Sequence, residues 1–331
     1  MKTSVTHITL PPGHGDHRLP FYLAMEEWAA RRLPPADYFF TWRVNPTVIF
    51  GRNQKIDAEV DTAYCSAHGI EMYRRRSGGG CVYADKDNIM MSYVTPGAAD
   101  VATTFRRYTG SVAAMLRSLG ISAEASGRND VTVEGRKVSG GAFYRIPGRS
   151  IAHSTMLWST NLEHMLRAIT PSRSKLEQKH VQSVQARITT LDRYLPGMTI
   201  EQFNAYAISR LTDREMHLTE AQVAEIRETE RPYHDPAWIY GRRSAATVVR
   251  SRSFPGVGQI DAEITVDRGI IADINLTGDY FLLSDLDSTL LCHLRGLPME
   301  PKAIAAALAK VDVSLTIFGL DNARLLSLLT E

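Results

Sequence analysis

A polar, charged segment between about Leu218 and Tyr240 divides this chain of 331 residues into two unequal parts. Pro232 and Pro236 lie close together within it, which is typical of a helix end followed by a connecting segment. A chain of this length also exceeds what a single hydrophobic core usually organises. We therefore predict two domains, a larger one over residues 1–245 and a smaller one over residues 246–331.

The larger part alternates segments with helical and strand-like patterns. Residues 41–50 are rich in β-branched and aromatic side chains and predict one strand that ends in a turn at Gly51. Residues 127–142 predict two strands joined by a turn at Glu134 and Gly135. Thr199 and Gln202 form a capping box at the start of one predicted helix. Helices are predicted over residues 21–33, 100–119, 161–169 and 199–211.

The smaller part begins with a hairpin. Apolar and polar residues alternate over 259–266, a turn of Asp267, Arg268 and Gly269 follows, and residues 270–276 return as a second strand. Alternation of this kind predicts that one face of the hairpin is buried. Helical segments are then predicted over residues 285–294, 301–310 and 321–329.

Composition and charge argue against several functional classes. Lys and Arg total 38 against 36 Asp and Glu, and no basic stripe is interleaved with aromatic residues, so we expect no nucleic-acid partner. We expect no membrane association either, because no apolar run reaches the ~18 residues of a spanning helix. The first twenty residues lack the apolar core of a secretion signal, and three widely spaced cysteines suggest neither disulfides nor a zinc site. We therefore expect a cytoplasmic protein.

Three successive glycines follow three arginines and are the strongest local feature. Glycines allow the backbone to approach a ligand closely and to turn several N–H groups toward an anion such as a phosphate. A glycine triplet by itself is more often a flexible surface loop with a solvated basic run. No Gly-Lys-Ser/Thr follows, so this is not a Walker loop. The run comprises Arg74, Arg75, Arg76, Ser77, Gly78, Gly79 and Gly80, followed by Cys81 and Val82.

A second feature lies in the predicted hairpin of residues 127–142. Lys137 precedes a glycine pair, Gly140 and Gly141, that could run against a bound ligand. A lone lysine is most often a solvated surface residue. Glycines have no purpose on an ordinary strand, however, so we favour a ligand-binding role for this segment.

These two features and four further stretches resemble lipoate-protein ligases. Residues 73–88 are similar to the family pattern RRxSGGGxVxHDxGN, and residues 127–142 to its GRND and GKxSGxA patterns. Residues 21–27, 51–54, 153–157 and 183–196 match further family stretches in the same order. Residues 238–241 and 278–281, together with the strand pair between them, resemble the accessory domain of full-length ligases. The resemblance covers nearly the whole chain.

The resemblance implies an α+β fold of the biotin/lipoate ligase type. Its catalytic domain has a mixed β-sheet with flanking helices, and a small α+β accessory domain follows. The implied reaction uses ATP and Mg²⁺: lipoate attacks the α-phosphate to give lipoyl-AMP, and a lysine of an acceptor protein then takes the lipoyl group. Implied acceptors are the lipoyl domains of 2-oxoacid dehydrogenase E2 subunits and the glycine cleavage H protein. The resemblance also suggests a monomer whose small domain rotates about a hinge within residues 232–250.

Site residues carry over by position. Lys137 matches the essential lysine, Arg75 an arginine beside the phosphates, and Asp130 the aspartate of GRND, which is also the candidate Mg²⁺ ligand. For His153, a ligand-binding role and a hydrogen-bonded core role are equally supported. The expected substrate-binding and ATP-binding residues are Arg75, Ser77, Gly78, Gly79, Gly80, Cys81, Val82, Asn88, Asn129, Asp130, Lys137, Ser139, Gly140, Ala142, His153 and Thr155.

Three positions depart from the family pattern and leave the acyl substrate open. Ala84 replaces the family histidine, Asp87 replaces a glycine, and Tyr22 replaces an asparagine. Loss of the histidine removes a polar group that we expect near the acyl pocket. Lipoate and an octanoate-like acid are therefore both candidate substrates.

Other functions are compatible with parts of this pattern. An octanoyl or lipoyl transferase would use a cysteine thioester and no ATP, with Cys81 as its candidate nucleophile, although a small buried residue is the favoured role for that cysteine. A biotin ligase is less well supported because its glycine-arginine loop differs. A ligand sensor without catalytic activity, or a nucleic-acid-binding module using Arg74 to Arg76, would lack the adenylation reaction.

Overall fold

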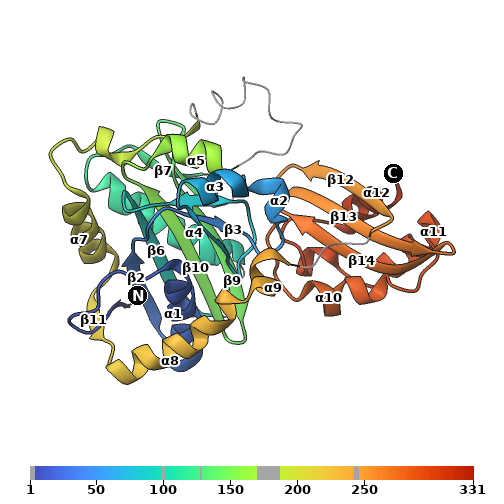
Figure 1. Ribbon diagram of the computed structural model, residues 1–331, viewed down its shortest axis with the longest axis horizontal. Helices are drawn as coiled ribbons and strands as arrows, with labels where there is room; N and C mark the ends of the chain where they lie inside the picture. The colour runs from blue at the N-terminus through green and yellow to red at the C-terminus, as the bar shows by residue number, and fades with distance from the viewer. Residues whose placement is uncertain (1–3, 98–100, 127–128, 170–186, 242–245) are drawn as a thin grey trace.

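The computed structural model describes residues 4–97, 101–126, 129–169, 187–241 and 246–331. Two bodies lie side by side along the longest axis of the molecule, one built by residues up to 241 and the other by residues from 246 (Figure 1). The predicted boundary between residues 245 and 246 adjoins residues 242–245, which lie outside the described part of the chain.

The first body is organised around one mixed sheet of eight strands, as the resemblance implied. Strands β11, β1 and β2 run parallel, and every other neighbouring pair in the sheet is antiparallel. In spatial order the strands are β11 (Arg214–His217), β1 (Val5–Thr9), β2 (Asp37–Trp42), β6 (Asn88–Pro96), β10 (Arg149–Leu157), β9 (Arg136–Ile146), β8 (Asp130–Val133) and β7 (Ala123–Ser126).

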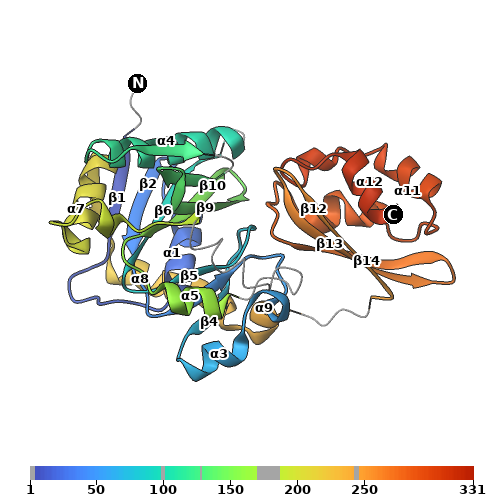
Figure 2. The ribbon, with the colours of Figure 1, turned by 90° about the horizontal axis from the view of Figure 1, so that it is seen from above.

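Helices cover both faces of this sheet. Figure 2 shows α4 (Val101–Arg117) on one side and α1 (Leu19–Arg32) with α8 (Glu220–Glu230) on the other. The apolar stripe predicted for α4 is buried, including Phe105, Tyr108, Val112 and Met115. Each face thus has its own hydrophobic core, with α1 in one and α4 in the other.

The predicted strand over residues 41–50 is wrong in one respect, because the structure breaks it into two strands that belong to different sheets. β2 ends at Trp42, and β3 (Thr47–Phe50) joins a separate three-stranded sheet of order β4–β3–β5. Pro46 lies at the end of the break, directly before β3, and has no backbone N–H to give to a ladder. The glycine-rich run connects β4 (Glu71–Arg74) to β5 (Val82–Ala84) in this second sheet.

The remaining elements of the first body confirm most of the local predictions. The turn between β8 and β9 has positive φ at both Glu134 and Gly135, as a two-residue hairpin turn requires. The capping box of Thr199 and Gln202 is formed. The other helical segments are α2 (Ile56–Glu59), α3 (Thr62–Ala67), α5 (Leu162–Ala168), η2 (Leu191–Arg193), α7 (Ile200–Leu211), η3 (Arg231–His234) and α9 (Pro236–Tyr240).

The second body packs helices against one face of a three-stranded antiparallel sheet. The predicted hairpin is formed by β13 (Gly258–Asp267) and β14 (Ile270–Gly278), and β12 (Val248–Phe254) pairs with β13. The helix predicted over residues 285–294 is interrupted at Leu290, where φ is −135°. The helical segments are α10 (Leu286–Thr289), η4 (Leu291–His293), α11 (Pro301–Leu308), η5 (Val313–Leu315) and α12 (Asn322–Thr330).

The two bodies touch through backbone and side-chain contacts. Gly278 N–H donates to Asn53 O at 2.8 Å, and Lys55 forms an ion pair with the buried Glu263. Within the described residues, no helix is both long enough and apolar enough to cross a bilayer.

Candidate functional site

A cavity of about 280 Å³ opens between the large sheet, the glycine-rich run and the segment that follows β14 in the second body. Most of the predicted site residues meet there, although they come from separate stretches of the sequence. Those that line it are Arg75, Gly79, Gly80, Cys81, Val82, Asn129, Asp130, Lys137, Gly140, Ala142, His153 and Thr155. Ser77, Gly78, Asn88 and Ser139 do not line it and lie buried behind its walls.

Gly78 and Gly79 of the glycine-rich run are packed so closely that a side chain is excluded at either position, whereas Gly80 is exposed. A Cβ on Gly78 would lie 2.2 Å from Tyr280 O, and one on Gly79 would lie 2.8 Å from the Phe281 ring. Gly79 also has a φ of +84°, a backbone conformation that favours glycine. The run is therefore a fixed wall of the cavity and differs from the flexible surface loop considered as the alternative.

Arg75 holds this wall from within. Its Nε–H donates to Ser77 Oγ, while its two terminal nitrogens donate to the carbonyl oxygens of Ile49, Gly78 and Gly80 at 2.7 to 2.9 Å. Burial lowers the pKa of Arg75 to about 10, so the guanidinium stays charged at neutral pH. Arg75 thus places a positive charge beneath the glycine backbone. Most of its N–H groups donate hydrogen bonds to the loop itself.

The two neighbouring arginines have different partners. Arg74 donates to five backbone carbonyl oxygens, in the turn of residues 51–54 and at the end of α9. Arg76 forms an ion pair with Glu27 of α1 at 2.8 Å. Neither side chain lines the cavity. The three arginines therefore mainly hold neighbouring backbone and α1 in place. Of the three, only Arg75 lines the cavity.

Lys137 reaches the cavity because of a bulge in its strand. The pairing of β9 with β8 shifts between Val131 and Thr132, so Lys137 and Gly140 come to lie on one face although their separation is odd. A Cβ on Gly140 would lie 2.4 Å from both Cε and Nζ of Lys137. The lysine side chain therefore occupies the space that a side chain at position 140 would need.

Asp130 is the counter-ion of this lysine. Its Oδ1 lies 2.8 Å from Lys137 Nζ, and the two side chains are 33% and 37% exposed. The pair is accessible enough to be rearranged by an incoming anion. Among the described residues no group of three or more His, Cys, Asp or Glu side chains is placed to hold a metal ion. Asp130 therefore belongs to no such group.

His153 is both a cavity residue and a hydrogen-bonded residue of the core. It is 6% exposed, its Nδ1 lies 2.9 Å from Glu26 Oε2, and its Nε2 lies 2.8 Å from Ser77 Oγ. The core role is therefore confirmed by these hydrogen bonds, and the position at the cavity is compatible with the predicted ligand-binding role. Asn88 in contrast is fully buried and donates to Tyr83 O and Thr160 Oγ1, away from the cavity.

An apolar group of cavity residues was not predicted from the sequence. Leu23, Trp42, Ile49 and Met90 come from α1, β2, β3 and β6, and they face the cavity together with the predicted Val82. Periodicity marks such residues as core, and nothing in it distinguishes a core position from the lining of an apolar pocket.

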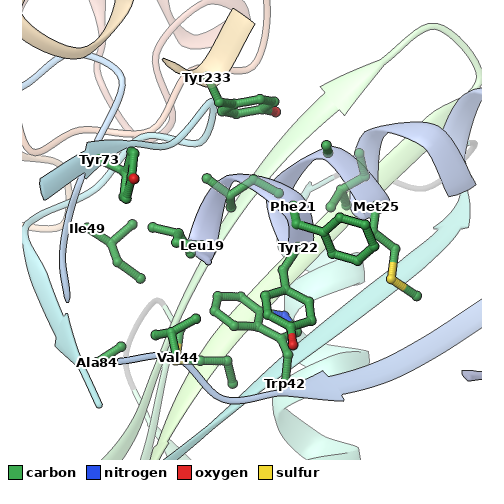
Figure 3. Packing of buried hydrophobic residues seen from close by; sticks show 14 of the residues in the cluster. Leu19, Phe21, Tyr22, Met25, Trp42, Val44, Ile49, Tyr73, Ala84 and Tyr233 are labelled. Carbon is green, nitrogen blue, oxygen red and sulfur yellow. The ribbon is translucent and has the colours of Figure 1, made fainter. Parts of the chain in front are cut away.

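Of the three positions that depart from the family pattern, Tyr22 and Ala84 are buried behind this apolar wall, and Asp87 is exposed. Tyr22 stacks on Trp42 with ring centroids 5.0 Å apart and an interplanar angle of 8° (Figure 3). Ala84 is fully buried in the core around α1 and does not line the cavity. The expectation that Ala84 removes a polar group beside the acyl pocket is therefore not supported by its position.

The second body supplies two further cavity residues that sequence patterns did not assign to the site. Asp279 and Phe281 line the cavity, and Gly79 N–H donates to the carbonyl oxygen of the intervening Tyr280 at 3.0 Å. Phe281 also packs near Phe143 of β9, with ring centroids 5.3 Å apart. Residues 278–281 were recognised as a motif, but only the fold shows that they meet a loop two hundred residues earlier.

Cys81 lines the cavity with a thiol that is poorly suited to nucleophilic attack. Burial raises its pKa well above the ordinary value for cysteine, and the nearby Glu59 charge acts in the same direction. The thiol is therefore neutral at physiological pH, and the residue itself is partly buried against the core around α1.

Comparison with characterised families covers both bodies. The family described as "Lipoyl protein ligase A/B catalytic domain" matches residues 19–212, and "Bacterial lipoate protein ligase C-terminus" matches residues 244–329. Lipoate-protein ligase LplJ of Bacillus subtilis is 33% identical over 301 residues, which are 88% of this chain and 90% of that protein. Lipoate–protein ligase 1 of Staphylococcus aureus is 30% identical over 315 residues, covering 93% and 95%.

Solved structures show the same fold. Plasmodium falciparum LipL1 in complex with lipoate aligns with a TM-score of 0.77 at 20% identity and 98% coverage of both chains. A bipartite lipoate protein ligase of Thermoplasma acidophilum, studied with its E2 lipoyl domain, gives 0.65 at 25% identity, covering 74% of this chain and all of that one. Lipoate-protein ligase A bound with ATP gives 0.61 at 24% identity, covering 73% and 99%. By family match and by identity over most of its length, this chain belongs to the lipoate-protein ligase family.

Proposed function

We propose that this chain activates lipoate with ATP and transfers the lipoyl group to a lysine of a carrier domain. The observation that carries the proposal is the cavity itself, in which the Lys137–Asp130 pair and the glycine backbone share one space with an apolar wall. An acyl adenylate needs both kinds of surface. Relatives named as lipoate-protein ligases, and solved homologues with lipoate or ATP, support this assignment.

In the first half-reaction, a carboxylate oxygen of lipoate attacks the α-phosphorus of ATP. The bond from that phosphorus to the bridging oxygen of pyrophosphate breaks, and pyrophosphate leaves with the electron pair. Negative charge grows on the α-phosphate oxygens, and we assign its stabilisation to the ammonium of Lys137. At ~3 Å and an effective dielectric of about 20, such a pair contributes roughly 5 kcal/mol before desolvation is subtracted.

In the second half-reaction, the amine of an acceptor lysine attacks the carbonyl carbon of lipoyl-AMP. An amide bond forms, AMP leaves, and the amine gives up one proton. No covalent bond to the enzyme is needed. The apolar wall formed by Leu23, Trp42, Ile49, Val82 and Met90 is assigned to the acyl chain, which fits lipoate and also an octanoate-like acid.

Mg²⁺ fits this site only as an ion that nucleotide phosphates help to hold. Proteins commonly bind Mg²⁺ through one or two carboxylates together with substrate phosphates. Asp130 supplies one such carboxylate, with Oδ1 engaged by Lys137. Bound there, the ion would neutralise phosphate charge alongside the lysine.

The partners and the domain organisation extend the proposal. We propose lipoyl domains of E2 subunits and the H protein as acceptors, a monomeric enzyme in the cytoplasm, and a division into residues 1–245 and 246–331. The archaeal homologue studied with its E2 lipoyl domain supports the choice of acceptor. A hinge between residues 232 and 250 should show different proteolytic protection with and without a lipoyl-AMP analogue, and identical cleavage would count against it.

A direct test is to incubate the protein with ATP, Mg²⁺, lipoate and a purified lipoyl domain. We expect the mass of the domain to increase by one lipoyl group on a single lysine, with release of AMP and pyrophosphate. An unmodified domain under conditions where the enzyme is folded would refute the proposal. Octanoate in place of lipoate tests the acyl preference.

The transferase alternative is tested by replacing Cys81 with Ala. Since burial keeps this thiol neutral, we expect the variant to retain at least half of its ligase activity, measured as lipoylation of the acceptor domain. Loss of activity to background in a stably folded variant would instead indicate a cysteine thioester.

A further inference from the structure

A chain of buried hydrogen bonds runs behind the cavity wall from its apolar to its polar part. Trp42 Nε1–H donates to Ser92 Oγ at 2.8 Å, and Ser92 Oγ–H donates to Glu26 Oε1 at 2.6 Å. Glu26 in turn lies 2.9 Å from His153 Nδ1, whose other ring nitrogen meets Ser77 at 2.8 Å.

The chain ends at the glycine loop. Arg75 Nε–H donates to Ser77 Oγ at 2.9 Å, and the same guanidinium holds the carbonyl oxygens of Gly78 and Gly80. Trp42 and Arg75 both line the cavity, as does His153. Glu26 does not line it and is 0% exposed.

The donors at the two ends set the direction of the bonds next to them. An indole N–H and a guanidinium can only donate. Ser77 Oγ accepts from Arg75, and His153 Nε2 is the acceptor placed for the Ser77 hydroxyl proton among the described residues. We assign this proton to Nε2, because the hydroxyl then donates as well as accepts; in this arrangement the imidazole carries its hydrogen on Nδ1 and donates it to Glu26.

Glu26 also acts on the far end of the chain through its charge. Burial lowers the pKa of Arg75, and the negative charge of Glu26 raises it in partial compensation. Both charges lie in the protein interior, where an uncompensated ion is costly. The carboxylate therefore has two links to Arg75, one electrostatic and one through His153 and Ser77.

We propose that Glu26 is a positioning residue of the adenylation site. It holds His153 in the Nδ1–H tautomer, and through that tautomer it orients Ser77, Arg75 and the backbone of the glycine loop. The effect on catalysis rests on the function proposed above. The tautomer itself is a property of the protein without substrate.

The test uses the full-length protein with ¹⁵N-labelled histidine. Nitrogen shifts distinguish the two neutral tautomers and the imidazolium, and the signal of His153 among the ten histidines is identified by its loss in His153→Gln. We expect wild-type protein to show a single Nδ1–H form. A single Nε2–H form or an imidazolium at neutral pH would overturn the proposal.

Glu26→Gln then tests the carboxylate. A glutamine offers one acceptor oxygen where Glu26 offers two, so Ser92 and His153 must share that oxygen, and the uncharged amide can also donate to His153 Nδ1. We expect a mixture of His153 tautomers and a fall in lipoate-dependent pyrophosphate exchange on the order of tenfold, the size of one lost hydrogen bond to a charged group. An unchanged single tautomer in a folded Glu26→Gln protein would also overturn the proposal.

Glu27→Gln is the matched control. Glu27 is the next residue on α1, is also buried, and pairs with Arg31 and Arg76. Its replacement should lower stability and leave the His153 signal as in wild type. If both variants shift that signal equally, Glu26 has only a general structural role. If wild-type protein shows the expected tautomer but no exchange, the proposed function fails and the assignment of the tautomer stands.

Discussion

The Lys137 side chain occupies the space that a side chain on Gly140 would fill. The register shift between β8 and β9 brings the two residues to one face, and Asp130 then holds the ammonium at 2.8 Å. A single carbon atom at position 140 therefore decides where the principal cation of the site lies. The constraint is local, because the atoms displaced by it belong to the flexible end of one lysine.

Gly140→Ala should displace Lys137 and leave the fold intact. We expect adenylation to fall by about tenfold or more, because the ammonium loses its position beside the cavity, while the melting temperature changes little. Lipoate-dependent pyrophosphate exchange and thermal unfolding measure the two effects. Gly110→Ala on α4, where nothing lies within 4 Å of the new carbon, is the control and should leave exchange unchanged. Full activity in Gly140→Ala would show that the lysine has no fixed position.

Lys137→Ala removes the cation completely. Loss of a main transition-state donor lowers rates by about 10²-fold or more, so we expect a decrease of that order in the adenylation rate. Stability should change little, because the side chain is partly exposed and its ion pair with Asp130 is accessible to solvent. Single-turnover formation of lipoyl-AMP is the measurement, and an undiminished rate would refute the assigned role.

At the scale of elements, the sheet of β4, β3 and β5 and its glycine loop form one unit around Arg75. Three hydrogen bonds from this side chain hold Ser77, Gly78 and Gly80 of the loop, and a fourth ties it to Ile49 of β3. The motif predicted that Arg75 lies beside the phosphates. The structure adds that its fork of donors is what holds the glycine backbone in place.

Arg75→Lys keeps the positive charge and removes the planar set of guanidinium N–H donors. A lysine cannot reach three carbonyl oxygens and a hydroxyl at once, so buried acceptors are left without donors. We expect a loss of about 3 kcal/mol in the free energy of unfolding, the scale for breaking a buried charged network. Urea denaturation measures it. Arg145→Lys, at an exposed side chain with one hydrogen bond to Gly97 O, is the control and should cost far less.

Whether a sequence prediction was correct depended on how far apart in the chain the residues that determine the structure lie. Short-range signals succeeded: the Glu134–Gly135 turn, the Thr199 capping box and the β13–β14 hairpin all formed as predicted. The strand over residues 41–50 failed because its two halves join different sheets, a choice made by distant partners. The bulge that turns Lys137 toward the cavity depends on pairing with β8, which periodicity does not encode.

At the scale of the whole molecule, the cavity is completed by both bodies. Phe281 of the second body is buried in the core around α4, where it packs against the contacting rings of Phe105 and Phe143, and its ring lies against Gly79. Apolar contact of this kind couples the stability of the two bodies. Sequence patterns could identify each body but could not predict this contact, because it joins residues about two hundred positions apart.

Phe281→Ala should weaken that coupling. Truncating a buried phenylalanine costs about 3–5 kcal/mol, and here the loss falls on the contact between the bodies. We expect calorimetry to show the two bodies unfolding at more widely separated temperatures than in wild type. Phe254→Ala, within the core of the second body, is the control and should lower the stability of that body alone. Identical calorimetric profiles for Phe281→Ala and wild type would contradict a coupling role.

Isotope exchange between pyrophosphate and ATP tests the central claim most directly, because it reports the first half-reaction without any acceptor protein. The account predicts that labelled pyrophosphate enters ATP only when lipoate, or an acid closely similar to it, is added, and that Lys137→Ala abolishes most of the exchange. Absence of exchange in folded wild-type protein supplied with Mg²⁺ and lipoate would contradict it, as would exchange at the same rate in the Lys137→Ala variant.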